Sequence, residues 1–200
     1  MGNDFRGIRL VSWDVDGTLF SYVRLTLELL RARPFSVREL RDVWDFHRSV
    51  ERQRRHESCA VIPAEMERIR QPQLQEKAAL EKALRRISPR RRAVSMIQQF
   101  VGLGIPQVAL SDFECNYKLD ALQLNSYFVK AYSCQQVGFW KPSPIPLAQI
   151  QNDFGIHPHE HLHIGDRQDT DGESCARNGC RFMLIDSLPK LWGTFNLIVC

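Results

Sequence analysis

The sequence predicts an α/β fold: a Rossmann-like parallel sheet flanked by helices, with an all-helical subdomain inserted into it. Over the second half of the chain, short apolar segments bounded by polar residues alternate with segments of helical periodicity, which is typical of a parallel sheet with right-handed crossovers. After the first apolar segment, residues 8–13, this alternation is interrupted, and residues 22–87 keep only the helical period. We therefore expect an α/β core from residues 1–20 and 88–200 and a helical cap from residues 21–87.

The segments expected to form strands are short and rich in aliphatic and aromatic residues. The first is apolar over nearly its whole length, as expected for a strand that is buried on both faces of a parallel sheet. The others follow at residues 107–110, 127–132, 162–164 and 181–185, with a sixth candidate at 196–199.

Helix signals fill the intervals between these strands. Ser88 and Pro89 predict a helix start, as N-cap and first helical residue, for a helix that ends near Gly102. Ser143 and Pro144 predict a second start of the same kind. Further helices are expected over residues 116–124 and 172–177.

The expected cap consists of three helical segments. Ser36 and Glu39 form a capping box that opens the second of them. The third is expected over residues 73–87. Pro63 and Pro72 are expected to interrupt the connections.

The composition indicates an ordinary globular protein. Apolar residues make up 44% of the 200 residues and charged residues 25%, which is enough for one compact core. No apolar run is long enough to span a bilayer, and the N-terminus lacks the apolar region of a secretory signal. The six cysteines form no Cys-x-x-Cys pair and lack the density of a disulfide scaffold. We therefore expect a cytoplasmic protein with no membrane contact and with reduced thiols.

Positive charge is concentrated in the insert. The net charge is +4, but residues 20–92 hold 18 lysines and arginines against 10 acidic residues, and the rest of the chain is acidic overall. A basic insert beside an acidic core would attract anionic substrates, although solvated helix faces produce the same count. Arg90, Arg91 and Arg92 crowd a predicted helix N-terminus, where the helix dipole disfavours cations. A contact with nucleic acid or a partner protein stays an alternative for this run.

The most distinctive stretch, Asp14-Val15-Asp16-Gly17-Thr18, follows the first strand. Ligands of open α/β sheets bind just beyond the carboxyl ends of the strands, so we expect these residues to line a site. Two carboxylates one residue apart suit a small hard cation. Gly17 permits a tight turn, and its amide and that of Thr18 could face an anion. A carboxylate beside a second acid also indicates a nucleophile with an acid–base partner.

Two further segments carry matching chemistry. Ser111, followed by Asp112, lies at the carboxyl end of the second strand and offers a hydroxyl donor for a phosphate oxygen. Lys141 precedes Pro142, which favours an extended backbone, and adjoins a predicted helix N-terminus. A lysine beside a helix N-terminus is a favourable place for an anion.

Acidic residues follow the fourth strand. Asp166 comes directly after it and is expected closest to a cation. Asp169 and Asp171 compete for an outer position, and Asp169 has an alternative role as the cap of the next helix. Because magnesium prefers a few carboxylates completed by water and substrate oxygens, the segment predicts a Mg²⁺ site.

These segments resemble the four motifs of the haloacid dehalogenase (HAD) superfamily of phosphohydrolases. The resemblance covers nearly the whole chain except the insert, which has the position of the family's helical cap. Family spacing favours Asp171 over Asp169 as the outer acid. The segment Ser111-Asp112-Phe113-Glu114 looks like a variant of a common Ser-Asn-Phe-Asp form.

The resemblance implies a Mg²⁺-dependent phosphohydrolase that acts on a small phosphorylated metabolite. Asp14 would form an aspartyl-phosphate intermediate, and Asp16 would act as general acid and base. Ser111 and Lys141 would hold the phosphoryl oxygens. The implied substrate-binding residues are Gly17, Thr18, Ser111, Asp112 and Lys141, and the implied metal ligands are Asp14, Asp16, Asp166 and Asp171.

Other activities share parts of this pattern. A phosphomutase carries the same motifs, and a dehalogenase of the same family uses an aspartate nucleophile but does not need Asp16. From a different class, a non-catalytic module could bind a protein or, less expected, nucleic acid through the basic insert.

A run of alternating histidines has the spacing of a metal-binding strip. Alternate residues share one face only in a fully extended segment, and Pro158 argues against extension through the whole run, which consists of His157, His159, His161 and His163.

Overall fold

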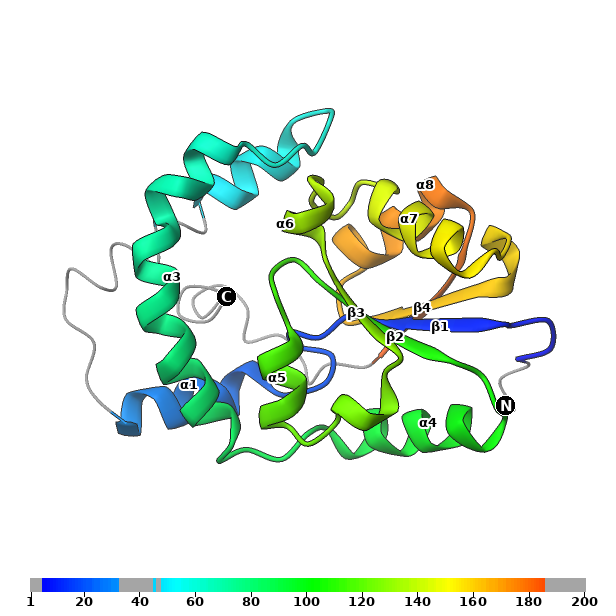
Figure 1. The fold of residues 1–200 in the computed structure, drawn as a ribbon, viewed down its shortest axis with the longest axis horizontal. Helices are drawn as coiled ribbons and strands as arrows, with labels where there is room; N and C mark the ends of the chain where they lie inside the picture. Colours follow the sequence, from blue (N-terminus) through cyan, green and yellow to red (C-terminus); the bar gives the residue numbers. More distant parts are fainter. Residues whose placement is uncertain (1–4, 33–44, 46–47, 186–200) are drawn as a thin grey trace.

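The computed structural model describes residues 5–32, 45 and 48–185. Five parallel strands form one sheet in the order β3-β2-β1-β4-β5, flanked by helices, as the sequence predicted (Figure 1). The strands are β1 (Leu10–Trp13), β2 (Gln107–Ser111), β3 (Lys130–Ser133), β4 (His161–Gly165) and β5 (Arg181–Leu184).

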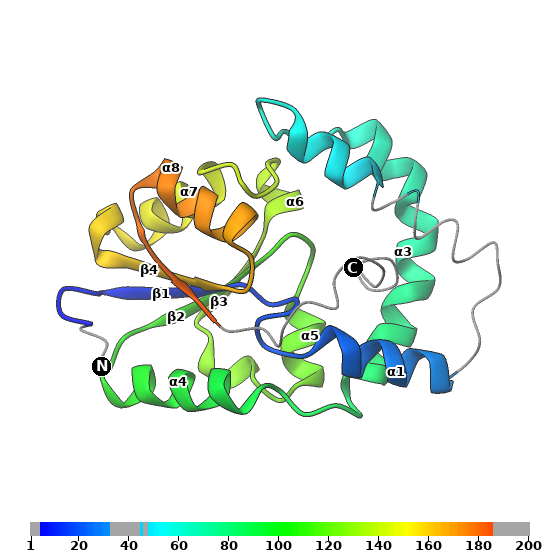
Figure 2. The ribbon, with the colours of Figure 1, turned by 180° about the vertical axis from the view of Figure 1, so that it is seen from behind.

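Alternate residues of the central strands enter two separate apolar clusters, one on each face of the sheet. Val11 and Ala109 belong to one cluster, whereas Leu10 and Val108 belong to the other. Helices α4 (Arg91–Gly102) and α5 (Asn116–Ala121) cover the first face, and α7 (Ile145–Phe154) and α8 (Glu173–Asn178) cover the second (Figure 2). Burial on both faces explains why β1 is almost wholly apolar.

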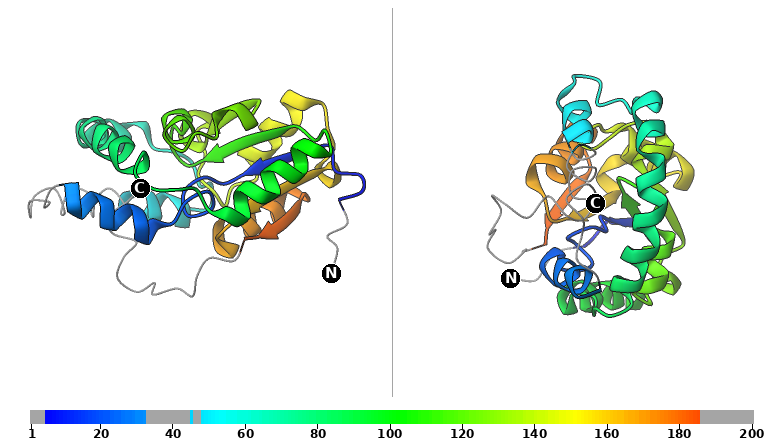
Figure 3. Two further views of the ribbon diagram at one scale, coloured as in Figure 1. Left: turned by 90° about the horizontal axis from the view of Figure 1, so that it is seen from below. Right: turned by 90° about the vertical axis from the view of Figure 1, so that its left-hand side faces the viewer.

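The segment between β1 and β2 contributes helices at the end of the molecule toward which the carboxyl ends of the strands point (Figure 1). It contains α1 (Tyr22–Ala32), a helical stretch over residues 48–55, and α3 (Pro63–Leu84). Figures 1 and 3 show these helices grouped beyond the carboxyl ends of the strands. We call this segment, residues 21–87, the helical insert. The division of the chain into core and cap at these residues stays a prediction.

Helix α3 begins earlier than the sequence predicted and runs through Pro72. Pro63 does stand at the start of a helix, where its missing N–H is not needed. The expected interruption at Pro72 is wrong. A proline inside a helix removes one backbone hydrogen-bond donor and tends to kink the helix. It need not end the helix when tertiary contacts fix the segments on both sides. Leu80 and Leu84 near its C-terminus are buried in the same cluster as α1.

Other element boundaries also differ from the prediction. Residues 125–127 form a 3₁₀ turn, so β3 starts three residues later than expected. Helix α4 starts at Arg91 with Arg90 as N-cap, so Ser88 is not the cap. Helix α7 has Pro144 as its N-cap, with the amide of Ile145 donating to Ser143 Oγ at 3.3 Å.

Short elements complete the described chain: α6 (Cys134–Val137), a 3₁₀ turn at Pro158–Glu160 and a π-helical turn at Gln168–Gly172. The predicted capping box at residues 36 and 39 and the sixth strand candidate at 196–199 lie outside the described residues. None of the helices in the described ranges has the length and apolar character needed to cross a membrane. The cysteines at positions 59, 115, 134, 175 and 180 are free thiols.

Candidate active site

The parallel register brings the predicted site residues to one edge of the sheet. Trp13 at the end of β1 lies beside Ala109 of β2 and Ile164 of β4. The next residue, Asp14, donates its backbone N–H to the Ile164 carbonyl at 2.8 Å. Side chains that follow these three strands therefore gather at a shared position, although they are up to about 150 residues apart in sequence.

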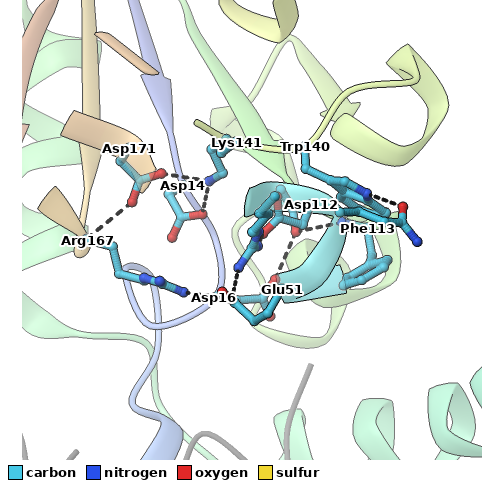
Figure 4. A network of polar contacts seen from close by, with 12 residues as sticks. Asp14, Asp16, Glu51, Asp112, Phe113, Trp140, Lys141, Arg167 and Asp171 are labelled. Atoms are coloured by element: carbon cyan, nitrogen blue, oxygen red, sulfur yellow. Dashed lines mark hydrogen bonds and ion pairs between the residues drawn. The ribbon is translucent and has the colours of Figure 1, made fainter. Parts of the chain in front are cut away.

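The first cluster is built around Asp14. Lys141 Nζ lies 2.6 Å from Asp14 Oδ1 and 2.7 Å from Asp171 Oδ1, so one ammonium joins two carboxylates (Figure 4). Thr18 Oγ1 donates to Asp14 Oδ2 at 2.7 Å. Asp166 lies in the same group, and all of these side chains are buried. We call Asp14, Asp166, Asp171, Lys141 and Thr18 the Asp14 cluster.

Two glycines are required for this close approach. Gly17 has φ +89°, and a Cβ built on it would collide with the Asp166 carboxylate. A Cβ on Gly165 would collide with the Asp171 carboxylate. The glycines beside the predicted acids therefore serve two purposes: a left-handed turn at Gly17 and room for carboxylates at both positions.

Electrostatics in the Asp14 cluster show a shortage of positive charge. Burial raises the pKa of Asp14 well above its ordinary value, more than Lys141 lowers it, and Asp171 and Asp166 add to the rise. Burial, and next Asp171, raise the pKa of Asp166 to about 6. Burial also acts to raise the pKa of Asp171, but Lys141 and His163 hold it below its ordinary value. Lys141 contacts two of the three buried carboxylates, Asp14 and Asp171, and a cation among the three would relieve their repulsion.

The same carboxylates fit a hard cation. Oxygens of Asp14, Asp166 and Asp171 all lie within 4.8 Å of one another. Carboxylate oxygens are the ligands that magnesium prefers, with water and substrate completing its shell. Asp169 lies apart from this group, and its carboxylate contacts Arg167 at 2.6 Å instead. The acid that the resemblance favoured, Asp171, is the one in the cluster.

A second cluster surrounds Asp16. Lys118 Nζ lies 2.6 Å from Asp16 Oδ1 and 2.5 Å from Oδ2, and Ser111 Oγ donates to Oδ2 at 2.8 Å. Lys118 is 1% exposed. Burial acts to lower the pKa of Lys118, but the Asp16 carboxylate raises it above its ordinary value, so the lysine stays charged. We call Asp16, Ser111 and Lys118 the Asp16 cluster.

The Asp16 side chain is therefore directed toward Ser111 and Lys118 and is not among the carboxylates grouped with Asp14. The sequence placed Asp16 with the metal ligands and Ser111 at the phosphate, and both assignments stay predictions. Lys118 was missed. Its signal was nevertheless present, because Cys115, Lys118 and Leu122 share one helix face, and the other two positions are apolar.

The helical insert reaches the site through its residues 48–62. Arg54 Nη2 donates to Asp112 Oδ2, and Arg54 Nη1 lies 2.5 Å from Glu51 Oε1. Arg167, on the loop after β4, lies 3.7 Å from the same Glu51 oxygen. Figure 4 shows this series of ion pairs crossing from the insert to the loops that carry the acids.

The insert also contacts the segment that carries Lys141. Trp140 Nε1 donates to the buried Gln53 Oε1 at 2.8 Å, and the Trp140 amide donates to the Cys59 carbonyl at 2.8 Å. An isolated antiparallel bridge pairs Ala60 with Phe139. The residue that precedes Lys141 is thus held by the insert.

The arginine run at the start of α4 has a structural explanation at its first position. The Arg90 amide donates to the Leu19 carbonyl at 2.8 Å, and Arg90 Nε donates to the Phe20 carbonyl at 3.3 Å. Arg90 therefore secures the loop that follows Asp14. Arg91 and Arg92 are exposed.

The alternating histidines divide into two pairs. The rings of His157 and His159 stack on the surface at 5.6 Å, whereas His161 and His163 are buried in β4. Among the described residues, the side chains close enough together to hold an ion are the three carboxylates of the Asp14 cluster, and no histidine is among them.

Known structures share this fold. A predicted phosphoglycolate phosphatase from Haemophilus somnus is 20% identical, with 93% of this chain and 88% of that chain aligned and a TM-score of 0.65. An L-2-haloacid dehalogenase from Xanthobacter autotrophicus is 18% identical over 92% and 79% of the two chains, with a TM-score of 0.65. YfnB of Bacillus subtilis, described as a HAD-hydrolase bound to magnesium, is 15% identical over 94% and 92%, with a TM-score of 0.66.

A search of curated protein sequences found no match. The model of one family, the haloacid dehalogenase-like hydrolases, matches residues 8–179, which include both clusters and the helical insert. The chain therefore belongs to the haloacid dehalogenase-like hydrolase family.

Proposed function

We propose that the protein is a Mg²⁺-dependent phosphohydrolase that acts on a small phosphorylated metabolite through an aspartyl-phosphate on Asp14. The observation that carries the proposal is the Asp14 cluster: a buried aspartate with one lysine 2.6 Å away and two further carboxylates beside it. A site that holds a carboxylate nucleophile, a resident ammonium and room for a cation is suited to a phosphate ester, whose charge needs compensation.

In the first half-reaction, an oxygen of the Asp14 carboxylate attacks phosphorus and the bond from phosphorus to the leaving oxygen breaks. Thr18 and Lys141 each donate to one oxygen of Asp14 and so fix the direction of the carboxylate. Lys141 also supplies positive charge for the phosphoryl oxygens. Asp16, two residues further on, takes up a proton as the substrate binds and passes it to the leaving oxygen.

In the second half-reaction, water attacks the phosphorus of the aspartyl-phosphate, Asp16 takes the water proton, and Asp14 is released as a carboxylate. Ser111 and Lys118 hold the Asp16 carboxylate at both of its oxygens. The cost of keeping this acid partly buried is offset by the lysine charge.

Asp14, Asp166 and Asp171 would hold the magnesium ion, which supplies Lewis-acid stabilisation of the transferring phosphoryl group. YfnB, a relative of the same fold, is bound to magnesium. The substrate would lie between the sheet edge and the helical insert, with Arg54, Asp112 and Arg167 at its boundary, and these residues would select among phosphorylated metabolites.

The test is a screen of phosphorylated metabolites for phosphate release, with magnesium and with a chelator. Asp14→Asn serves as the matched control, because it keeps the size of the side chain and removes the nucleophile. The proposal expects phosphate release that requires magnesium and is abolished in the Asp14→Asn variant while its circular dichroism is unchanged. Full phosphatase activity in that variant would overturn it.

A dehalogenase is the second candidate, since an L-2-haloacid dehalogenase has the same fold. Halide release from 2-haloacids without a divalent cation, together with no phosphate release from any ester, would select that candidate. The presence of Asp16 and of three clustered carboxylates favours the phosphatase.

A further inference from the structure

A line of buried polar side chains runs through the sheet and ends at the Asp14 cluster. It starts at Gln151 on α7 and passes through His161 on β4, Ser12 on β1 and His163 on β4 to Asp171. The four donor–acceptor distances along it are 3.2, 2.7, 2.7 and 3.3 Å in that order. Both histidines and Ser12 are fully buried. Buried polar groups of this kind destabilise the folded state unless each has a hydrogen-bond partner.

The direction of every hydrogen bond in this line follows from its end. Both rings are fully buried, which disfavours the charged imidazolium and lowers the pKa of His161 to about 3, so each ring is neutral and carries one N–H. The Asp171 carboxylate can only accept, so the proton of His163 is on Nε2 and its Nδ1 is an acceptor. Ser12 therefore donates its single hydroxyl proton to His163 Nδ1.

The remaining bonds are then fixed. Ser12 Oγ has no second proton, so it accepts from His161 Nε2–H. His161 Nδ1 is left as an acceptor for the Gln151 amide. Asn178 holds that amide in register, because its Oδ1 accepts from Gln151 Nε2 at 2.5 Å and its Nδ2 donates to Gln151 Oε1 at 3.2 Å. All donors point toward Asp171.

We propose that His163 is a positioning residue for Asp171, and that Ser12 and His161 act by fixing the tautomer in which His163 Nε2 donates to that carboxylate. The proposal deepens the proposed function, because it concerns a carboxylate that we assign to the cation. Asp171 Oδ1 takes Lys141 and His163, and its Oδ2 takes the Arg167 amide at 3.2 Å, so both oxygens have fixed directions. A carboxylate oriented by neutral donors keeps its charge for the lysine and the cation.

The first test is made on the unaltered protein, without metal or substrate. Long-range nitrogen-15 NMR of the imidazole side chains distinguishes protonated from unprotonated ring nitrogens, and the histidines are assigned with His→Gln variants. We expect the Nε2–H tautomer for both His161 and His163. An Nδ1–H tautomer, or rapid exchange between the two forms, at His163 would overturn the proposal whatever the enzyme's activity proves to be.

The second test uses paired variants. His163→Gln keeps an N–H donor near the position of Nε2, whereas His163→Leu removes it. We expect His163→Leu to weaken binding of Mn²⁺, used as a spectroscopic probe, by about 10-fold, and His163→Gln to restore most of that affinity. Ser12→Ala should release the tautomer preference at His163 and weaken Mn²⁺ binding by a smaller factor. The exposed His159→Gln is the matched control and should change neither quantity.

Equal Mn²⁺ affinities for the Gln and Leu variants would contradict a positioning role. If His163→Leu does not fold, the tautomer measurement on the unaltered protein and the Ser12→Ala variant still decide the matter. A protein that shows the expected tautomers but releases no phosphate would retain the inference and discard the proposed function.

Discussion

The two aspartates of the first motif lie two residues apart and have matching partners, yet their surroundings differ. Asp14 accepts from the Thr18 hydroxyl and from Lys141, and Asp16 accepts from the Ser111 hydroxyl and from Lys118. Around Asp14, however, Lys141 also contacts Asp171, and a third carboxylate, Asp166, lies in the same group.

The difference indicates that the two aspartates have different roles. The Asp16 cluster is balanced by itself, one acid against one lysine, so it is complete in the free protein. The Asp14 cluster has one lysine for three carboxylates, whose repulsion contributes to the raised pKa of Asp14 and Asp166, and a cation would compensate this charge deficit. Metal binding should therefore depend on one cluster and be nearly independent of the other, and the following predictions test this separation.

Replacing Lys141 with Met should have the largest effect. We expect phosphatase turnover to fall by about 10³-fold, because the variant loses the buried cation that faces both nucleophile and phosphoryl oxygens. Magnesium affinity should rise at least about tenfold, since the ion no longer competes with an ammonium among the carboxylates. Isothermal titration calorimetry and steady-state kinetics measure the two effects. Unchanged or weaker metal binding would contradict the proposed charge deficit.

Replacing Lys118 with Met should reduce turnover by about 10²-fold, because Asp16 loses its position as acid and base. Magnesium affinity should stay within about twofold of the original. Removing one partner of a buried ion pair should also lower the free energy of unfolding by about 3 kcal/mol.

The double variant Asp16→Asn/Lys118→Met provides the control for that cost. It leaves no uncompensated charge, so urea denaturation should show that part of the lost stability has returned. Additive losses from the two substitutions would mean that the pair does not contribute as a unit.

A fall in pH should destabilise the protein through the buried histidines, whose line of hydrogen bonds ends at the Asp14 cluster. Burial, with a smaller contribution from His163, lowers the pKa of His161 to about 3 from its ordinary 6.5. Between pH 7 and pH 5 the unfolded chain gains a proton at this position and the folded chain does not. The unfolded state is thereby favoured, and stability falls as the pH falls.

His161→Gln should remove this contribution. We expect the unaltered protein to lose about 2 kcal/mol more than the variant between pH 7 and pH 5 in urea denaturation. A variant with the same pH dependence as the unaltered protein would show that His161 takes up a proton in the folded state.

Deleting the two hydroxyls should give the smallest changes. Thr18→Val and Ser111→Ala each remove one neutral donor to a carboxylate and should cost about 1 kcal/mol of stability. Thr18→Val should also weaken magnesium binding slightly, and Ser111→Ala should not. Similar effects on metal affinity from both variants would remove the distinction between the clusters.

The sequence predicted the order of the elements and the acids at the strand ends, because strand ends of a parallel sheet meet at one edge whatever lies between them. Asp14, Asp166 and Asp171 could be grouped for that reason. Lys118 could not be found in the same way: a lysine in a short helix is usually exposed, and its burial depends on Asp16, about a hundred residues away.

The histidine alternation shows the same limit. His161 and His163 share a face of β4, as alternate residues of a strand do, but their partner is Ser12 on a different strand, which only the register of β1 against β4 reveals. The break at Pro72 was predicted from local preference alone. Tertiary packing at both ends of α3 outweighs that preference, as it often does.

The contact between Gln53 and Trp140 has a mechanical consequence. Trp140 is joined by one peptide bond to Lys141, and its ring and amide are both held by residues 53–59 of the insert. A retreat of that part of the insert, to admit a substrate or to let phosphate depart, has to break these bonds or draw the Lys141 backbone along with it. The same movement would then open the site and draw Lys141 away from Asp14. Water that enters the open site would find the nucleophile without its lysine partner.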